Sequence, residues 1–273
     1  MIKTFLANAA AVAGVVTIVS LAPVSQSYAQ DSAALSAIIA GEHRSDVNKA
    51  RDNYRHPLET LSFFGVEPNH TVVEIFPGNG WYTEILAPYV REHGKLIAAG
   101  YPRSAESSAM MQQMNSTYDA MLATRPDLYD RVEIAELHPR QLSTIAEPGT
   151  VDFILDFRNA HNWLNWGAEN MLMTWRSALK DGGMVGVVDH RMEPDREPGN
   201  GYIHEKTLID TMEEYGFEFV ASSEINANPG DTKDHPGGVW NLPPNLRDVP
   251  AADQAKYLTI GESDRLTMLF RKR

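Results

Sequence analysis

The sequence predicts an α/β fold with a doubly wound sheet, in which parallel strands alternate with helices. Short runs of β-branched and apolar residues recur along the chain between segments with helical spacing. The clearest strand, residues 71–76, is a run of β-branched and apolar residues interrupted only by Glu74, as in parallel strands that are covered on both faces. A Pro-Gly-Asn-Gly turn follows it, and then a helix from residue 83 that is expected to end before Pro88. A strand, a glycine turn and a helix N-terminus in this order predict a nucleotide-like ligand at the carboxyl edge of the sheet.

Length and composition narrow the possible functions. The chain has 273 residues, a formal net charge of −12 and no cysteine. It is long enough to bury a large core without a metal or disulfide. The negative charge would repel a phosphate backbone, so we expect no nucleic-acid partner. The absence of cysteine excludes thiol catalysis, thiolate metal sites and disulfides.

Residues 1–29 have the pattern of a secretory signal peptide. Lys3 precedes an apolar run over residues 9–22, and Ser27-Tyr28-Ala29 forms a small-x-small cleavage site. The pattern predicts a periplasmic or secreted protein with no stable membrane insertion after cleavage. The alternative is a permanent anchor over residues 5–22, which approaches the roughly 20 residues that span a membrane.

Residues 30–65 are expected to form N-terminal helices before the first strand. Residues 33–50 have helical spacing broken at Gly41, and residues 58–64 form a short helix stopped by Gly65. Between them lie the polar and aromatic side chains of residues 51 and 54–56, which are expected beside the ligand site or on a solvated helix face. The next elements are a strand at 94–99, a Met-rich helix at 104–122 and a strand at 131–135.

The run Val-Val-Glu-Ile-x-Pro-Gly-Asn-Gly-x-x-Thr-Glu at residues 72–84 resembles the first motif of class I S-adenosylmethionine-dependent methyltransferases. A second run, Ala-Leu-Lys-Asp-Gly-Gly-Met-Val-x-Val-Val-Asp at residues 178–189, resembles the junction before their fifth strand. The chain is also similar to exported bacterial predicted methyltransferases. The resemblance implies a Rossmann-like, seven-stranded sheet over residues 66–273 with strand 7 antiparallel.

The same resemblance implies S-adenosylmethionine as cofactor and a small-molecule substrate, aromatic or hydroxyl-bearing. Two positions depart from the family pattern. Phe76 stands where a glycine is usual, and the second strand ends at Gly100-Tyr101-Pro102 without the acidic residue that takes the ribose. By the resemblance, the cofactor-binding residues are Glu74, Pro77, Gly78, Gly80, Tyr82, Glu136 and Asp156.

The fourth strand is expected at residues 151–157, and the loop that follows it holds two candidate catalytic residues. His161 has the pKa range of a general base at neutral pH, and Arg158 could hold an acidic substrate. His190, at the end of the fifth strand, is a further candidate. Alternatively, His161 caps the next helix, and the nearby Trp163 and Trp166 belong to the core.

Residues 226–263 separate the last two strands, and we interpret them as a cover over the substrate with Trp240 as its aromatic contact. Two other functions are open. Asp156, Asp189 and the histidines could bind a metal, although no compact His-x-x-x-His pair supports one and we predict no metal site. The protein could instead be a non-catalytic ligand-binding protein on this fold. The sequence predicts no oligomeric state.

Overall fold

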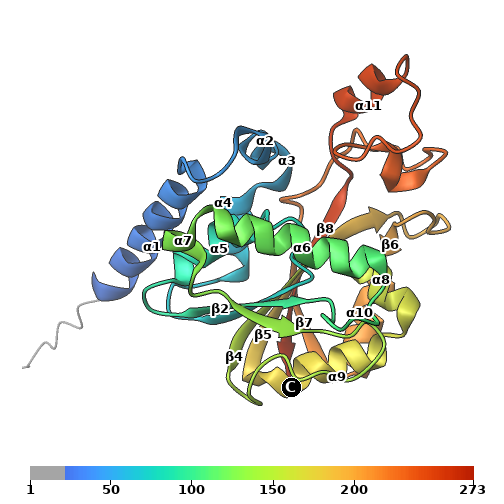
Figure 1. The fold of residues 1–273 in the computed structure, drawn as a ribbon. Helices are drawn as coiled ribbons and strands as arrows, with labels where there is room; N and C mark the ends of the chain where they lie inside the picture. Colours follow the sequence, from blue (N-terminus) through green and yellow to red (C-terminus); the bar gives the residue numbers. More distant parts are fainter. Residues whose placement is uncertain (1–21) are drawn as a thin grey trace, which may run out of the picture.

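The computed structural model describes residues 22–273 and has one mixed sheet at its centre (Figure 1). The strand order is β3-β2-β1-β4-β5-β8-β7, and β8 runs antiparallel to both of its neighbours. The predicted Rossmann-like sheet with an antiparallel last strand is therefore confirmed. The strands are β1 (Thr71–Ile75), β2 (Lys95–Gly100), β3 (Glu133–Glu136), β4 (Val151–Phe157), β5 (Leu179–Met192), β7 (Phe217–Ser223) and β8 (Arg265–Lys272). A short strand, β6 (Ile203–His204), pairs with the end of β5.

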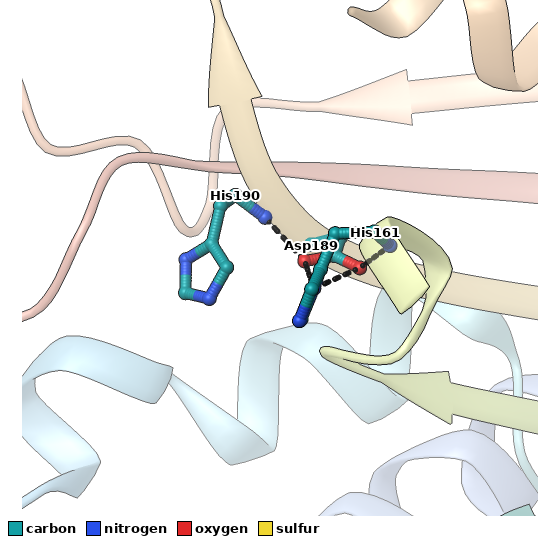
Figure 2. Close-up of side chains that lie close together, drawn as sticks. All are labelled: His161, Asp189 and His190. Carbon is teal, nitrogen blue, oxygen red and sulfur yellow. Dashed lines mark hydrogen bonds and ion pairs between the residues drawn. The ribbon is translucent and has the colours of Figure 1, made fainter. Parts of the chain in front are cut away.

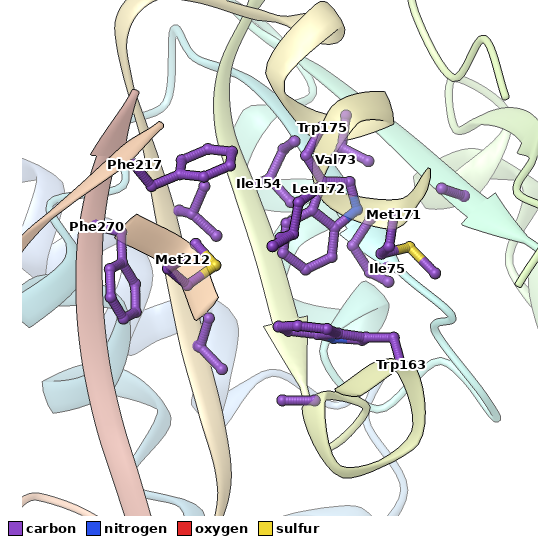
Figure 3. Packing of buried hydrophobic residues seen from close by; sticks show 14 of the residues in the cluster. Val73, Ile75, Ile154, Trp163, Met171, Leu172, Trp175, Met212, Phe217 and Phe270 are labelled. Carbon is purple, nitrogen blue, oxygen red and sulfur yellow. The ribbon is translucent and has the colours of Figure 1, made fainter. Parts of the chain in front are cut away.

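Helices cover both faces of this sheet because its central strands are apolar on both sides. One cluster of buried side chains joins the sheet to α8, α9 and α10, with Trp163, Leu172 and Met212 among its members (Figure 3). The other joins the opposite face to α1, α4 and α5. The helices are α1 (Ala22–Ala40), α2 (Asp46–Lys49), α3 (Asp52–Arg55), α4 (Pro57–Phe64), α5 (Thr83–Val90), α6 (Ala109–Thr124), α7 (Pro126–Tyr129), α8 (Ala160–Trp166), α9 (Ala168–Ala178), α10 (Glu205–Glu214) and α11 (Gln254–Ile260).

Helix α5 continues past Pro88, where the sequence predicts that it ends. A proline inside a helix leaves the carbonyl four residues earlier without its usual N–H partner. Here that carbonyl belongs to Glu84, and the ring nitrogen Nε2 of His43 lies 2.9 Å from it. A distant side chain thus replaces the missing donor, which a local pattern does not reveal.

The segment between β7 and β8 packs against the carboxyl end of the sheet. It contains the 3₁₀ helix η1 (Gly238–Asn241) and α11, and it forms the orange and red extension in Figure 1. Within it, Val239 packs against Met192 and Tyr202, which places the segment next to the end of β5.

The predicted signal peptide lies mainly in residues 1–21, which are outside the described residues. Helix α1 begins at Ala22, so it includes the predicted cleavage site. In the part of the chain that the structure describes, no helix is both long and apolar enough to span a membrane. Export remains a prediction.

Replacement of Leu172 by alanine should lower the free energy of unfolding by about 2–5 kcal/mol, because it opens a cavity between α9 and the sheet. Leu172 is fully buried, whereas the next residue, Met173, is 44% exposed. Met173→Ala on the same helix is therefore the matched control and should change stability by less than about 1 kcal/mol. Denaturant unfolding measures both values. Equal losses in the two variants would contradict the packing described here.

Candidate functional site

The Asp189 carboxylate lies at the centre of the candidate site. It is fully buried at the end of β5 and faces the start of α8 (Figure 2). Its oxygens accept hydrogen bonds from the backbone N–H of His161 at 2.9 Å and of His190 at 2.7 Å. It also lies 2.9 Å from the ring nitrogen Nδ1 of His161. The strand β5 thereby supplies the cap for α8 and fixes the orientation of the His161 ring.

His161 has one ring nitrogen bonded and one free. Nδ1 faces the Asp189 carboxylate, which can only accept, so in the neutral ring this nitrogen carries the proton. Nε2 is buried and has no partner among the described residues. Burial lowers the pKa of His161, but the charge and hydrogen bond of Asp189 outweigh burial, so its pKa lies above the ordinary value. An oriented imidazole with a free Nε2 lone pair is the arrangement of a general base.

His190 has no free ring nitrogen for this role. Its Nε2 lies 3.2 Å from Nε of Arg158, which only donates, so Nε2 must accept. Its Nδ1 then carries the proton and donates to Oγ of Ser263 at 2.5 Å. Burial and then the charge of Arg158 hold the pKa of His190 well below its usual range. His190 was predicted as a catalytic residue. In the structure both of its ring nitrogens are engaged, and its Nε2 positions Arg158.

A metal ion is a poor match for this donor set. Ligand atoms of His161, Asp189 and His190 lie within 4.8 Å of one another. However, the Asp189 carboxylate already accepts hydrogen bonds from two backbone N–H groups, and the His190 Nε2 lone pair already accepts one from the Arg158 guanidinium. A positive charge at that nitrogen opposes cation binding.

An aromatic ring and a cavity adjoin His161. The Trp240 ring, from η1, lies edge-on to His161 with 5.6 Å between ring centroids, and 6.3 Å from His190. A cavity of about 400 Å³, the histidine cavity, lies between α8, the segment 198–204 and α10, with His161, Asn165, Tyr202 and Thr211 in its wall. Its size suits a small molecule.

The predicted cofactor loop has the expected backbone but almost no free space beside it. Gly78 and Gly80 have positive φ angles of 59° and 79°. Phe76 also adopts a left-handed conformation, with φ of 42°, where a glycine would be unstrained. Its ring stacks on Tyr101 with 4.4 Å between centroids. The cavity lined by Phe76, Pro77 and Gly78, the glycine-loop cavity, has a volume of only about 10 Å³.

Helix α6 closes the other side of this loop. A Cβ atom at Gly80 would lie 2.0 Å from Cε of Met121, so this methionine fills the space that the glycine leaves. The Tyr118 hydroxyl lies 3.1 Å from Oγ1 of Thr83, which in turn donates to the Glu74 carboxylate at 2.5 Å. Burial raises the pKa of Glu74 to about 8. The glycine-loop cavity is therefore far smaller than the roughly 300–1,000 Å³ of usual ligand cavities.

The remaining predicted cofactor residues are engaged elsewhere. Asp156 accepts from Trp163 Nε1 at 2.7 Å and Asn159 Nδ2 at 2.9 Å, and burial raises its pKa to about 7. The Tyr82 ring stacks on Phe157 with 3.4 Å between centroids. Glu136 is exposed at the end of β3 and lies outside the wall of the glycine-loop cavity.

Comparison with known proteins supports the fold. No protein-family model and no curated protein sequence matches the chain. Among solved structures, a SAM dependent methyltransferase from Aquifex aeolicus is 16% identical with a TM-score of 0.55, covering 82% of this chain and 93% of its own. A geranyl diphosphate methyltransferase in complex with SAM is 14% identical, with a TM-score of 0.55 over 87% and 95% of the two chains. The [4+2]-cyclase SpnF is 14% identical, with a TM-score of 0.54 over 90% and 94%.

The chain has the class I methyltransferase fold. At these identities the likeness extends to the fold and leaves the reaction open. Within this methyltransferase fold, sequence reasoning found His161, Arg158 and His190, and the structure brings them together. It did not include Asp189 among the catalytic residues, although this acid sits at the carboxyl end of a predicted strand beside His190. It missed Ser263 entirely, because only the fold brings β8 to β5.

Opening the glycine-loop cavity should create or strengthen S-adenosylmethionine binding. Titration calorimetry of wild-type protein should give no saturation at millimolar cofactor, because Phe76 and Met121 fill the space. The double variant Phe76→Gly, Met121→Ala should bind at least about ten-fold more tightly. Met110→Ala, on the same helix but 56% exposed, is the control. Micromolar binding by the wild type would show instead that the cavity opens in solution.

Proposed function

We propose that the protein is an enzyme that uses His161 as a general base on a small molecule bound in the histidine cavity. The observation that carries this proposal is the buried Nε2 of His161, which has no partner in residues 22–273 while Nδ1 is bonded to Asp189. Buried polar atoms almost always have partners, so an isolated lone pair on an oriented base favours a role in catalysis.

The chemistry follows from the two sides of the ring. Nε2 accepts a proton from an acidic O–H or N–H group of the substrate. The electron pair of that bond stays on the substrate oxygen or nitrogen, which becomes the nucleophile, and the ring becomes positively charged. The Asp189 carboxylate, 2.9 Å from Nδ1, stabilises that charge without a change of geometry. The Trp240 ring, packed edge-on against His161, shields the base from water. Water exclusion strengthens the Asp189–His161 interaction.

Methyl transfer is the second candidate, namely from S-adenosylmethionine to a small aromatic or hydroxyl-bearing acceptor. The left-handed Gly78 and Gly80 and the buried Glu74 at the end of β1 favour it, as does the likeness in fold. Two points oppose it: the closed glycine-loop cavity, and the predicted export of the protein away from a cytosolic cofactor. The structurally similar SpnF is described as a [4+2]-cyclase, so a likeness to this fold does not by itself imply methyl transfer.

Asp189→Asn should lower the pKa of His161, because a neutral amide no longer stabilises the imidazolium. In the wild type the pKa is raised, so the neutral base is lost as the pH falls through a value above about 6.5. In the variant this loss should occur at lower pH. The NMR signal of His161 Cε1 measures the titration, and the exposed His93 is the internal control. An unchanged His161 titration would contradict the proposed pair.

Catalysis itself can be tested with a defined mixture of hydroxyl-bearing small molecules, followed by mass spectrometry. The wild type should convert one component, and His161→Gln should reduce that rate by about 10²-fold or more, as loss of a general base does. His138→Gln, on a partly buried histidine outside the wall of the histidine cavity, should retain the rate. Conversion that survives in His161→Gln would refute the role of His161.

A further inference from the structure

Four arginine side chains gather near His161 and His190. Arg51 Nε lies 2.6 Å from Oε1 of Glu262. On the other oxygen, Oε2, Arg55 Nε lies at 3.4 Å and Arg265 Nη2 at 2.6 Å. Arg158 is close enough to interact electrostatically with Arg55, Arg265 and Glu262. We call Arg51, Arg55, Arg158 and Arg265 the arginine cluster; its members come from the N-terminal helices, the loop after β4 and the start of β8.

The cluster has more positive than negative charge. Three of the guanidinium groups contact the Glu262 carboxylate, and Arg158 interacts at longer range with Glu262 and Asp189. Glu74 also lies near Arg55, but with a pKa of about 8 it is largely protonated at neutral pH. Burial, with the neighbouring arginines adding in the same direction, lowers the pKa of Arg55 to about 9 and of Arg158 to about 10. Buried like charges are costly unless an anion joins them.

Some N–H donors of the arginine cluster have no partner among the described residues and are available to bind such an anion. Nη2 of Arg51 is buried and has no hydrogen-bond partner among the described residues. Arg158 donates through Nε to His190, and in residues 22–273 its two terminal nitrogens bond no protein group. Arg158 also has a φ angle of 69°, a left-handed conformation that is uncommon for a residue with a side chain. Strained residues of this kind often lie at functional sites.

We propose that the arginine cluster binds an anionic group of the substrate, a carboxylate or a phosphate. This inference rests on the proposed function and names the class of its substrate: a small organic anion with an acidic O–H or N–H group. Arg158 bonds His190, and the His190 ring lies 5.4 Å from that of His161. An anion on Arg158 is therefore separated from the base by a single side chain, that of His190. Guanidinium forks match the oxygens of both anions.

Titration calorimetry with inorganic phosphate and with benzoate, as separate probes, tests this proposal. The wild type should bind at least one probe saturably, and the probe that binds identifies the anion. Arg158→Gln should weaken that binding by at least about ten-fold, as expected for loss of a charge-assisted hydrogen bond. Arg103→Gln is the matched control, because Arg103 is paired with Asp119 at an exposed site. If Arg158→Gln does not fold, Arg51→Gln takes its place.

The outcomes separate this inference from the proposed function. His161→Gln should bind the anion as the wild type does, because the base is not an anion ligand. Anion binding with a normal Arg158 effect, but conversion that does not depend on His161, would refute the proposed function alone. Absence of saturable binding of both probes at millimolar concentration would overturn the inference. So would binding that Arg158→Gln leaves unchanged, since the cluster would then serve only to hold Glu262 in place.

Discussion

The Asp189 carboxylate is the group on which the candidate site depends. It is buried at the end of β5 and accepts N–H groups from His161 and His190, so it joins a central strand to the first turn of α8. A buried carboxylate without these donors would be strongly destabilising. Its position therefore fixes the His161 ring, and through the His190 backbone it also fixes the neighbour that orients Arg158. One strand end thus determines both the base and the anion-facing side of the site.

The glycine-loop cavity and the histidine cavity share no lining residue, so the loop that is typical of the fold lies apart from the proposed reaction site. The first retains the backbone of a cofactor loop, but Phe76, Tyr101 and Met121 fill the space beside it. The second lies beyond α8 and contacts the base. A sheet of this kind can keep its architecture while its loops change their ligand, because ligands bind mainly to the loops that the sheet positions.

Local patterns predicted the sheet well, because β-branched runs and glycine turns act over a few residues. They also located His161, Arg158 and His190, since carboxyl ends of parallel strands share one edge. They did not predict that helix α5 continues past Pro88, because the Glu84 carbonyl that the proline leaves without a donor is met by His43 from another part of the chain. For the same reason, the sequence could not reveal that Glu262 and Arg265 meet Arg51 and Arg55: these residues lie near opposite ends of the chain, and only the complete fold joins them.

The protonation state of His161 tests this account most directly. Two-dimensional ¹⁵N–¹H NMR at a pH above the His161 pKa distinguishes its two ring nitrogens. We expect a proton on Nδ1, bonded to Asp189, and an unprotonated Nε2 that is free to accept one. A neutral ring that carries its proton on Nε2 would leave no lone pair facing the substrate, and it would contradict the assignment of His161 as the base.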